Sequence, residues 1–328
     1  MDTVKRLSYN ELTERVTVRV SPLRGVYSRE PQWSRAERMD ADDVKIGAKT
    51  GQRGTLKPRT ESDGMDFSSD TAYGLADLHM HTNYSDGTGS VEEVLAFAQQ
   101  HTALDVIAIT DHDTIEGALR ARDLVAKGKY RFEVIVGEEI STREGHLLAL
   151  YLHKPIAPNQ SIERSIELIR EQGGVAIVAH PFNRVFRHSV QRSVMNRLLR
   201  QPELHPDGIE TLNGSFAGIG SSQLAMSLAR NVYHWAETGG SDAHTPTAVG
   251  CARTVFAGNS AAEVRGAIER RETAPLGAFW QPREYVAFVS HRMRHGGGAT
   301  HDLLTVKPAR ASFGVWAQRR LASRERSA

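Results

Sequence analysis

Histidine and carboxylate side chains recur in this sequence directly after short apolar segments. The chain contains 14 histidines in 328 residues. Such residues follow apolar runs at six places: His79 and His81; Asp111 and His112; Glu138 and Glu139; His180; Asp242 and His244; and His146, which begins the run after Glu139. In parallel α/β folds, sites are built at the carboxyl ends of strands. The clustering therefore predicts one site at a single edge of a sheet.

The spacing of these residues indicates which side chains can meet. His79 and His81 are separated by one residue, so on a strand both rings point to the same face, where two imidazoles can reach one ion. Asp242 and His244 repeat this spacing. Adjacent residues point to opposite faces, so at most one of Glu138 and Glu139 faces the interior.

The residue types favour a metal centre. Six histidines and three carboxylates form the candidate set: His79, His81, Asp86, His112, one glutamate of the 138–139 pair, His146, His180, Asp242 and His244. Imidazole and carboxylate ligands without cysteine suit Zn²⁺, Mn²⁺ or Fe²⁺. Nine ligands, at about three per ion, suggest three ions with open coordination positions. We expect two to three divalent ions and a metal-dependent hydrolase.

The elements that must position these residues alternate between strand and helix from residue 75 onward. Apolar strands are expected at 104–110 and 174–180, and amphipathic helices at 91–100, 115–128, 161–172 and 260–272. The first helix has Val91, Val94, Leu95 and Ala98 on one face. Strands that are apolar at every position are buried on both faces. The pattern predicts a parallel α/β sheet, open or closed into a barrel, over residues 75–275.

The flanking segments are expected to lie outside this domain. Residues 1–74 predict a short strand near 15–20 followed by a polar linker. Residues 276–328 form a basic extension: residues 291–328 hold eight Lys or Arg against two acidic residues, although the whole chain has a net charge of +2. A basic tail can be a solvated segment or can steer toward nucleic acid.

Composition excludes several classes of protein. Hydrophobic residues make up 40% of the chain and charged residues 24%, which is ordinary globular usage. There is no run of about 18 apolar residues, so no membrane span is expected. The N-terminal residues lack the apolar core of a secretory signal, and Cys251 is the single cysteine. These features favour the cytoplasm.

The ordered motifs resemble the PHP family, the polymerase and histidinol phosphatase domains. The order is HxH, Asp86, TDHD, G-x-E, His146, HP and SDAH, over residues 75–257. This resemblance implies a distorted (β/α)7 barrel with a three-metal cluster. The family pattern G-x-E selects Glu139 over Glu138. Because all nine positions are occupied, the sequence does not resemble the degenerate, non-catalytic members of the family.

The resemblance also implies a distribution of ligands among three ions. One ion is expected to take His79, His81, Glu139 and Asp242. The second is expected to take Asp86, His112 and His180, and the third to share Glu139 with His146 and His244.

Further residues are expected to act on the substrate. Asp111, Arg184 and His188 are the candidate catalytic residues outside the ligand set, with Arg187 and Arg143 behind Arg184 as phosphate-orienting cations. In such a site the cations lower the pKa of a bridging water and neutralise charge on a phosphate.

Three functions are compatible with these features. The leading hypothesis is a phosphomonoesterase that acts on a small molecule, including a nucleotide. The alternative is an exonuclease or phosphodiesterase acting on nucleic-acid ends, and the third is a regulatory module without catalysis. A small substrate predicts that removing residues 291–328 changes kcat/KM by less than about tenfold, or 1.4 kcal/mol.

Overall fold

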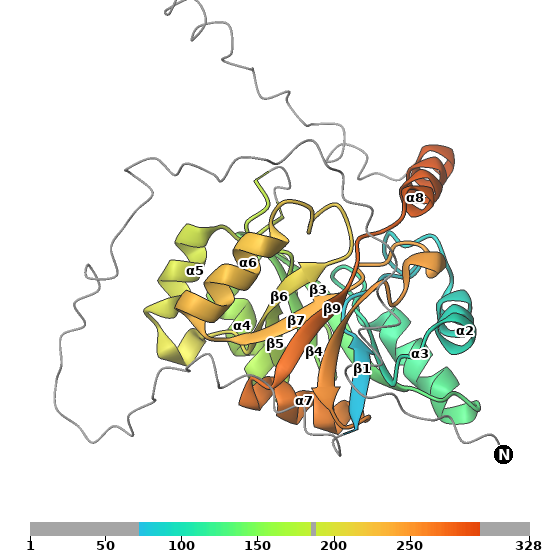
Figure 1. The fold of residues 1–328 in the computed structure, drawn as a ribbon, viewed down its shortest axis with the longest axis horizontal. Coiled ribbons are helices and arrows are strands. Elements are labelled where there is room, and N and C mark those ends of the chain that lie inside the picture. Colours follow the sequence, from blue (N-terminus) through green and yellow to red (C-terminus); the bar gives the residue numbers. More distant parts are fainter. Residues whose placement is uncertain (1–71, 185–187, 296–328) are drawn as a thin grey trace, which may run out of the picture. The chain divides into compact units, whose positions relative to one another are not determined.

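A single sheet organises the part of the chain that the computed structural model describes, residues 72–184 and 188–295. Its nine strands are β1 (Tyr73–Asp77), β2 (Val106–Ile109), β3 (Glu133–Thr142), β4 (Gly145–Leu150), β5 (Val175–Val178), β6 (Gly208–Asn213), β7 (Ala236–Gly240), β8 (Ala252–Ala257) and β9 (Thr273–Gly277). Their order is β7-β6-β5-β4-β3-β2-β1-β8-β9, and β7 also packs against β9. The sheet therefore forms a nearly closed barrel (Figure 1), which confirms the expected α/β barrel-like fold.

The sheet is mixed, whereas the sequence pattern predicted a parallel one. Strands β1, β2 and β3 run parallel, as do β5, β6 and β7. Strand β4 is antiparallel to both neighbours, and β8 is antiparallel to β1 and β9. The prediction of uniform direction was wrong for a physical reason. Only two residues, Arg143 and Glu144, separate β3 from β4, and so short a connection makes a hairpin rather than a crossover.

This hairpin matters for the position of His146. In the hairpin register His146 pairs with Ser141, near the carboxyl end of β3. The amino end of β4 therefore lies at the same edge of the sheet as the carboxyl end of β3. His146, near the start of β4, therefore lies at the same edge of the sheet as residues at the carboxyl ends of other strands.

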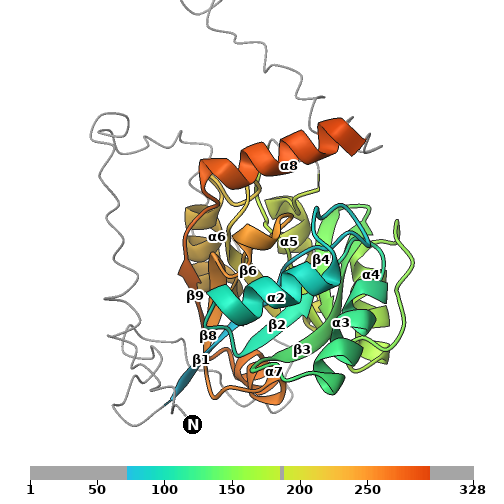
Figure 2. The ribbon, with the colours of Figure 1, turned by 90° about the vertical axis from the view of Figure 1, so that its right-hand side faces the viewer.

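Helices cover the sheet as the apolar patterns predicted (Figure 2). They are α2 (Val91–His101), α3 (Glu116–Lys127), α4 (Ile162–Glu171), α5 (Arg192–Leu199), α6 (Ser222–Leu228), α7 (Ala261–Arg270) and α8 (Pro282–His295), with short turns at Pro202–Leu204, Ala229–Tyr233 and Pro246–Ala248. Capping boxes begin α2 and α7: Ser90 with Glu93, and Ser260 with Glu263. None of the described helices combines the length and apolar character that crossing a membrane requires.

The core lies between the sheet and these helices. The expected helix faces are buried, including Val94 and Leu95 on α2 and Ile166 on α4. All four residues of β2 and of β5 are buried, as expected for strands covered on both faces. Each fully buried Leu, Ile or Val side chain contributes about 1.5–3 kcal/mol relative to exposure. The buried sheet therefore fixes the positions of the backbone from which the side chains at its edge extend.

The structure bears differently on the predictions for the two segments that flank the domain. The expected strand near residues 15–20 lies outside the described residues. Strand β9 crosses the expected boundary at residue 275, and α8 follows within the segment expected to be a basic extension.

Candidate metal centre

The structure brings the nine candidate ligands to one edge of the sheet. His79 and His81 follow β1, His112 follows β2, His180 follows β5, and Asp242 and His244 follow β7. Glu139 lies in β3, His146 begins β4, and Asp86 lies in the loop before α2. Side chains separated by as many as 165 positions therefore face one another.

The carboxylate of Glu139 occupies the middle of this cluster. Its Oε1 lies 2.7 Å from His146 Nδ1 and 3.0 Å from His180 Nε2. Its Oε2 lies 3.2–3.3 Å from ring nitrogens of three further histidines, His79, His81 and His112. Two oxygens of one carboxylate thus face two different sets of imidazoles, which is the arrangement of a ligand shared between cations.

The atoms fall into three groups that could each hold a cation. They are His79, His81, Glu139 and Asp242; His81, Asp86, His112 and His244; and His112, Glu139 and His146. Ligand atoms within a group lie within 4.8 Å of one another. Two ligands on opposite sides of one ion, at about 2.1 Å each, would lie about 4.2 Å apart. The groups are therefore close to the size that a divalent ion requires.

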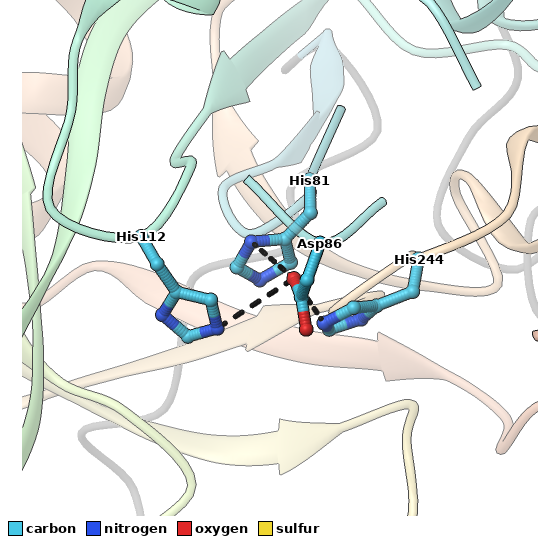
Figure 3. Close-up of side chains that lie close together, drawn as sticks. All are labelled: His81, Asp86, His112 and His244. Carbon is cyan, nitrogen blue, oxygen red and sulfur yellow. Dashed lines mark ion pairs between the residues drawn. The ribbon is translucent and has the colours of Figure 1, made fainter. Parts of the chain in front are cut away.

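Asp86 is the acidic member of the second group (Figure 3). Its Oδ1 lies 3.0 Å from His244 Nε2, 3.8 Å from His112 Nε2 and 3.9 Å from His81 Nδ1. These three rings approach one oxygen from three sides. The other oxygen, Oδ2, accepts a hydrogen bond from Arg292 on α8 at 2.9 Å.

Two members of the cluster have unusual backbone geometry. His180 has φ of 26° and Asp242 has φ of 49°, a region that side-chain-bearing residues rarely adopt. Neighbouring groups hold both: His180 N donates to Glu210 Oε2 at 2.9 Å, and Asp242 N donates to the carbonyl of His79 at 2.8 Å. Strained residues of this kind concentrate at functional sites, where the surrounding structure fixes them.

The charges in the cluster are strongly coupled. Burial lowers the pKa of the His112 ring to about 3. For His81 burial acts in the same direction, but the carboxylates of Asp242 and Glu139 outweigh it and raise the pKa to about 10. Burial alone would raise the pKa of Glu139, yet the surrounding imidazoles hold it well below its usual range. The cluster therefore presents ionised carboxylates, and a ring such as that of His81 must lose a proton before it binds a cation, whereas that of His112 is already neutral near pH 7.

The donor set fits divalent ions. In the described part of the chain, Nδ1 and Nε2 of His81 and Nδ1 of His112, His146 and His180 are buried without a hydrogen-bond partner. This holds although carboxylate oxygens are as near as 2.7 Å, in the case of His146. Unpaired ring nitrogens in such a buried cluster are available as cation ligands. Nε2 of His79 and of His180 instead forms a hydrogen bond with the Glu139 carboxylate, at 3.2 Å and 3.0 Å. Hard oxygen and borderline nitrogen donors suit Zn²⁺, Mn²⁺ or Fe²⁺.

Comparison with known proteins identifies the family. Residues 77–218 match the PHP domain, and residues 222–273 match the PHP-associated segment. An uncharacterized protein of Methanocaldococcus jannaschii is 37% identical over 150 residues, which cover 42% of this chain and 81% of that protein. The chain belongs to the PHP family. It is thus a metal-dependent phosphoester hydrolase of the PHP type.

Two further proteins are similar to this chain. A two-domain protein of Bacteroides vulgatus, described as containing a predicted PHP-like metal-dependent phosphoesterase, superposes with a TM-score of 0.52 at 18% identity, over 74% of this chain and 75% of that one. A 5'-3' exoribonuclease of Haemophilus influenzae is 36% identical over 107 residues, 31% of this chain. The match spans only 37% of that enzyme.

The structure pairs the PHP ligands differently from the sequence expectation. The first expected set, His79 with His81, Glu139 and Asp242, is found together. Of the expected set Asp86, His112 and His180, only the first two lie together, and His244 takes the place given to His180. His180 instead lies against Glu139, with its ring centroid 5.4 Å from that of His146. The strained backbones of His180 and Asp242 set these directions, and strand spacing does not reveal them.

The three candidate catalytic residues have different surroundings in this PHP domain. The Asp111 carboxylate accepts hydrogen bonds from Thr82 N, Thr82 Oγ1 and Ser85 Oγ at 2.6–2.7 Å, so it holds the loop after β1 rather than facing the ligands. The exposed His188 stacks on His146, with centroids 4.7 Å apart, and so reaches the rim of the cluster.

The arginines expected to orient phosphate do not gather at the cluster. Arg184 and Arg143 are exposed, and no contact between either side chain and the nine ligands is found among the described residues. Arg187 lies outside the described residues.

Sequence reasoning missed Glu210, which supports two of the ligands from behind. It is a buried residue of β6 whose Oε1 lies 2.9 Å from His79 Nδ1. Its Oε2 accepts hydrogen bonds from His180 N and Asn213 Nδ2, both at 2.9 Å. A carboxylate only accepts, so the proton of His79 sits on Nδ1 and leaves Nε2 for a cation. A charged residue in the middle of the short segment 208–214, which reads as a strand, was the available signal.

Glu210→Gln is expected to weaken metal binding by about 10–100-fold while the fold is kept. The glutamine carbonyl can still accept from His79, but its amide then faces two donors, His180 N and Asn213 Nδ2. Metal titration followed by calorimetry measures the change. Glu237→Gln is the matched control, because Glu237 on β7 pairs with the exposed Arg230 away from the cluster. Equal affinities in the two variants would contradict the role given to Glu210.

Proposed function

We propose that this chain hydrolyses a small phosphomonoester, of nucleotide size, at divalent cations held by the nine clustered ligands. The observation that carries the proposal is the position of Glu139, whose two oxygens face separate sets of imidazoles. The proposed sites are His79, His81, Glu139 and Asp242; Asp86, His112 and His244; and Glu139, His146 and His180. Such a set has too many donors for a structural ion and leaves positions open for substrate oxygens.

The protein groups have distinct tasks in this proposal. Divalent cations, when bound, lower the pKa of water and neutralise charge on a phosphate. Glu139 fixes the spacing of two of the sites, because one rigid carboxylate serves both. Glu210 and Asn213 orient the ligands: Asn213 Nδ2 bridges Glu210 Oε2 at 2.9 Å and Asp242 Oδ2 at 3.1 Å. This support keeps the ligands in place before substrate arrives.

A small substrate is favoured by the surroundings of the cluster. Helix α8 packs beside His244, with the ring of Phe288 4.8 Å from that of His244. Arg292 of the same helix reaches Asp86. A helix placed this close to the ligands restricts the space available for a polymer, which supports a small substrate.

The substrate class is tested by assaying phosphate release. With Mn²⁺, Zn²⁺ or Fe²⁺ supplied, we expect inorganic phosphate to be released from nucleoside monophosphates and other small monoesters. The same preparations should shorten oligonucleotides at least about tenfold more slowly, a difference of 1.4 kcal/mol in the barrier. Cleavage of oligonucleotides without phosphate release from any monoester would contradict a monoesterase.

The second candidate is an exonuclease acting on nucleic-acid ends. The specific observation in its favour is the similarity to the exoribonuclease of Haemophilus influenzae over 107 residues. An enzyme that holds several backbone phosphates releases counterions, so its KM for an oligonucleotide rises steeply with salt. Measuring both reactions at two salt concentrations separates the candidates, because a small monoester shows a much weaker dependence.

A further inference from the structure

Helix α8 is attached to the metal centre by aromatic and backbone contacts. Trp280, just before the helix, donates from Nε1 to the carbonyl of Ser241 at 2.8 Å, one residue before Asp242. Trp280 also lies 5.8 Å from the ring of His244, measured between centroids. Tyr285 on the helix packs against Phe216, which follows β6. Figure 2 shows α8 lying across one end of the sheet. The helix is therefore part of the wall of the site.

This helix places a buried arginine next to the cluster. Arg292 is 8% exposed, and in the described part of the chain no other arginine is buried. Its Nη1 donates to Asp86 Oδ2 at 2.9 Å, and its guanidinium lies 5.4 Å from the centroid of the Phe288 ring. The two oxygens of Asp86 thus have different partners. Oδ1 faces the imidazoles of His244, His112 and His81, and Oδ2 accepts the hydrogen bond from Arg292.

The guanidinium keeps unused donors at this position. Arginine has five N–H donors in a planar fork, and the contact with Asp86 uses Nη1. Arg292 Nε is buried and has no hydrogen-bond partner among the described residues. Burying a charged donor without a partner is costly. A ligand that brings oxygen atoms and negative charge would remove this cost.

We infer that Arg292 binds the phosphate group of the substrate, delivered to the metal centre by α8. The inference rests on the proposed function, since it assigns a residue to the substrate of that site. The carboxylate of Asp86 contacts the guanidinium through Oδ2, and its Oδ1 faces the position that a cation held by Asp86, His112 and His244 would occupy. An arginine fork matches the oxygens of a phosphate and binds them with two parallel hydrogen bonds. Asp86 then serves both the cation and the arginine.

The assignment reverses the expectation for the C-terminal segment. A small phosphomonoester substrate predicted that removing residues 291–328 would change kcat/KM by less than about tenfold. Arg292 belongs to that segment, so removing residues 291–328 is now expected to lower kcat/KM by more than about tenfold. The relevant positive charge is one buried guanidinium, and the net charge of the tail is not the cause.

The test compares Arg292→Ala with Arg294→Ala, both in the metal-loaded full chain. Arg294 is two residues further along the same helix, exposed, and bonded to the carbonyl of Ser290. Calorimetry with inorganic phosphate is the first readout, and steady-state hydrolysis of a nucleoside monophosphate is the second. Arg292→Ala should raise both the phosphate Kd and the KM by at least about tenfold. Arg294→Ala should leave both within about twofold of the wild type. Arg292→Lys should recover only part of the loss, because an ammonium lacks the fork.

Metal content, measured by mass spectrometry, separates this role from a purely structural one. Unchanged metal content with weakened phosphate binding supports the inference. Loss of one ion with unchanged phosphate affinity would show that Arg292 only positions Asp86, and would overturn it. Arg292→Gln keeps a long polar side chain without the charge and replaces the alanine variant if that one does not fold. If the wild type hydrolyses no phosphoester, the proposed function fails, while phosphate binding still decides the role of Arg292.

Discussion

Replacing Glu139 by glutamine is expected to lower kcat/KM for phosphoester hydrolysis by about a thousandfold or more, equivalent to about 4 kcal/mol. The variant removes the negative charge that faces five imidazoles and replaces one ligand oxygen by an amide nitrogen, which cannot bind a cation. Two of the proposed sites lose a ligand at once. Metal content should fall together with activity, and circular dichroism should show that the fold is kept.

Glu138→Gln is the control for this experiment. Glu138 is the adjacent residue of β3, and its side chain points to the opposite face, where Oε2 accepts a hydrogen bond from Ile156 N at 2.9 Å. Burial raises the pKa of this carboxyl to about 7, so near neutral pH it is already partly uncharged. The glutamine carbonyl can keep the same hydrogen bond. We therefore expect activity within about threefold of the wild type. A dead Glu138→Gln beside an active Glu139→Gln would reverse the assignment of the shared ligand.

The edge of the sheet at which the site lies could be predicted from sequence because strand ends are visible in the hydrophobic pattern. Apolar runs followed by His or Asp mark the points where chains leave the core. Alternation on a strand then explains why Glu139 and Glu138 separate, and why His79 and His81 stay together. These inferences depend on local geometry, which a short segment of sequence determines.

The partners of each ligand could not be predicted in the same way. His180 and Asp242 leave their strands with positive φ, so their side chains point where no regular strand would send them. The hydrogen bonds that hold these conformations come from Glu210 and His79, which are distant in sequence. Distribution of ligands among ions is thus a property of tertiary contacts.

Helix α8 illustrates a second limit of sequence reasoning. Charge counting groups Arg292 with the other basic residues of 291–328, because composition ignores which face of a helix a residue occupies. Tyr285, Phe288 and Arg292 are spaced at i, i+3 and i+7, the positions of a single helix face. That spacing was the available signal, and it indicates a helix packed through aromatic residues with an arginine on the packed side.

The proposed division of ligands among cations predicts selective loss of metal. Asp86 belongs to one of the three groups and Glu139 to the other two. Asp86→Asn should therefore remove about one ion per chain, because an amide oxygen is a weaker ligand than a carboxylate. The group formed by His79, His81, Glu139 and Asp242 should keep its ion. Mass spectrometry of the purified protein, after equilibration with Mn²⁺ or Zn²⁺, measures the stoichiometry.

Asp113→Asn is the matched control for this prediction, since it makes the same chemical change near the same cluster. Asp113 follows His112, belongs to none of the three groups, and accepts a hydrogen bond from Ser141 N at 2.7 Å. Its φ of 55° is one that asparagine tolerates, so the substitution adds little strain. Metal content should equal that of the wild type. Because Asp86 belongs to only one of the three groups, Asp86→Asn should leave the other ions bound. Loss of every ion would mean that the groups form one cooperative site, and loss of none would mean that Asp86 serves Arg292 alone.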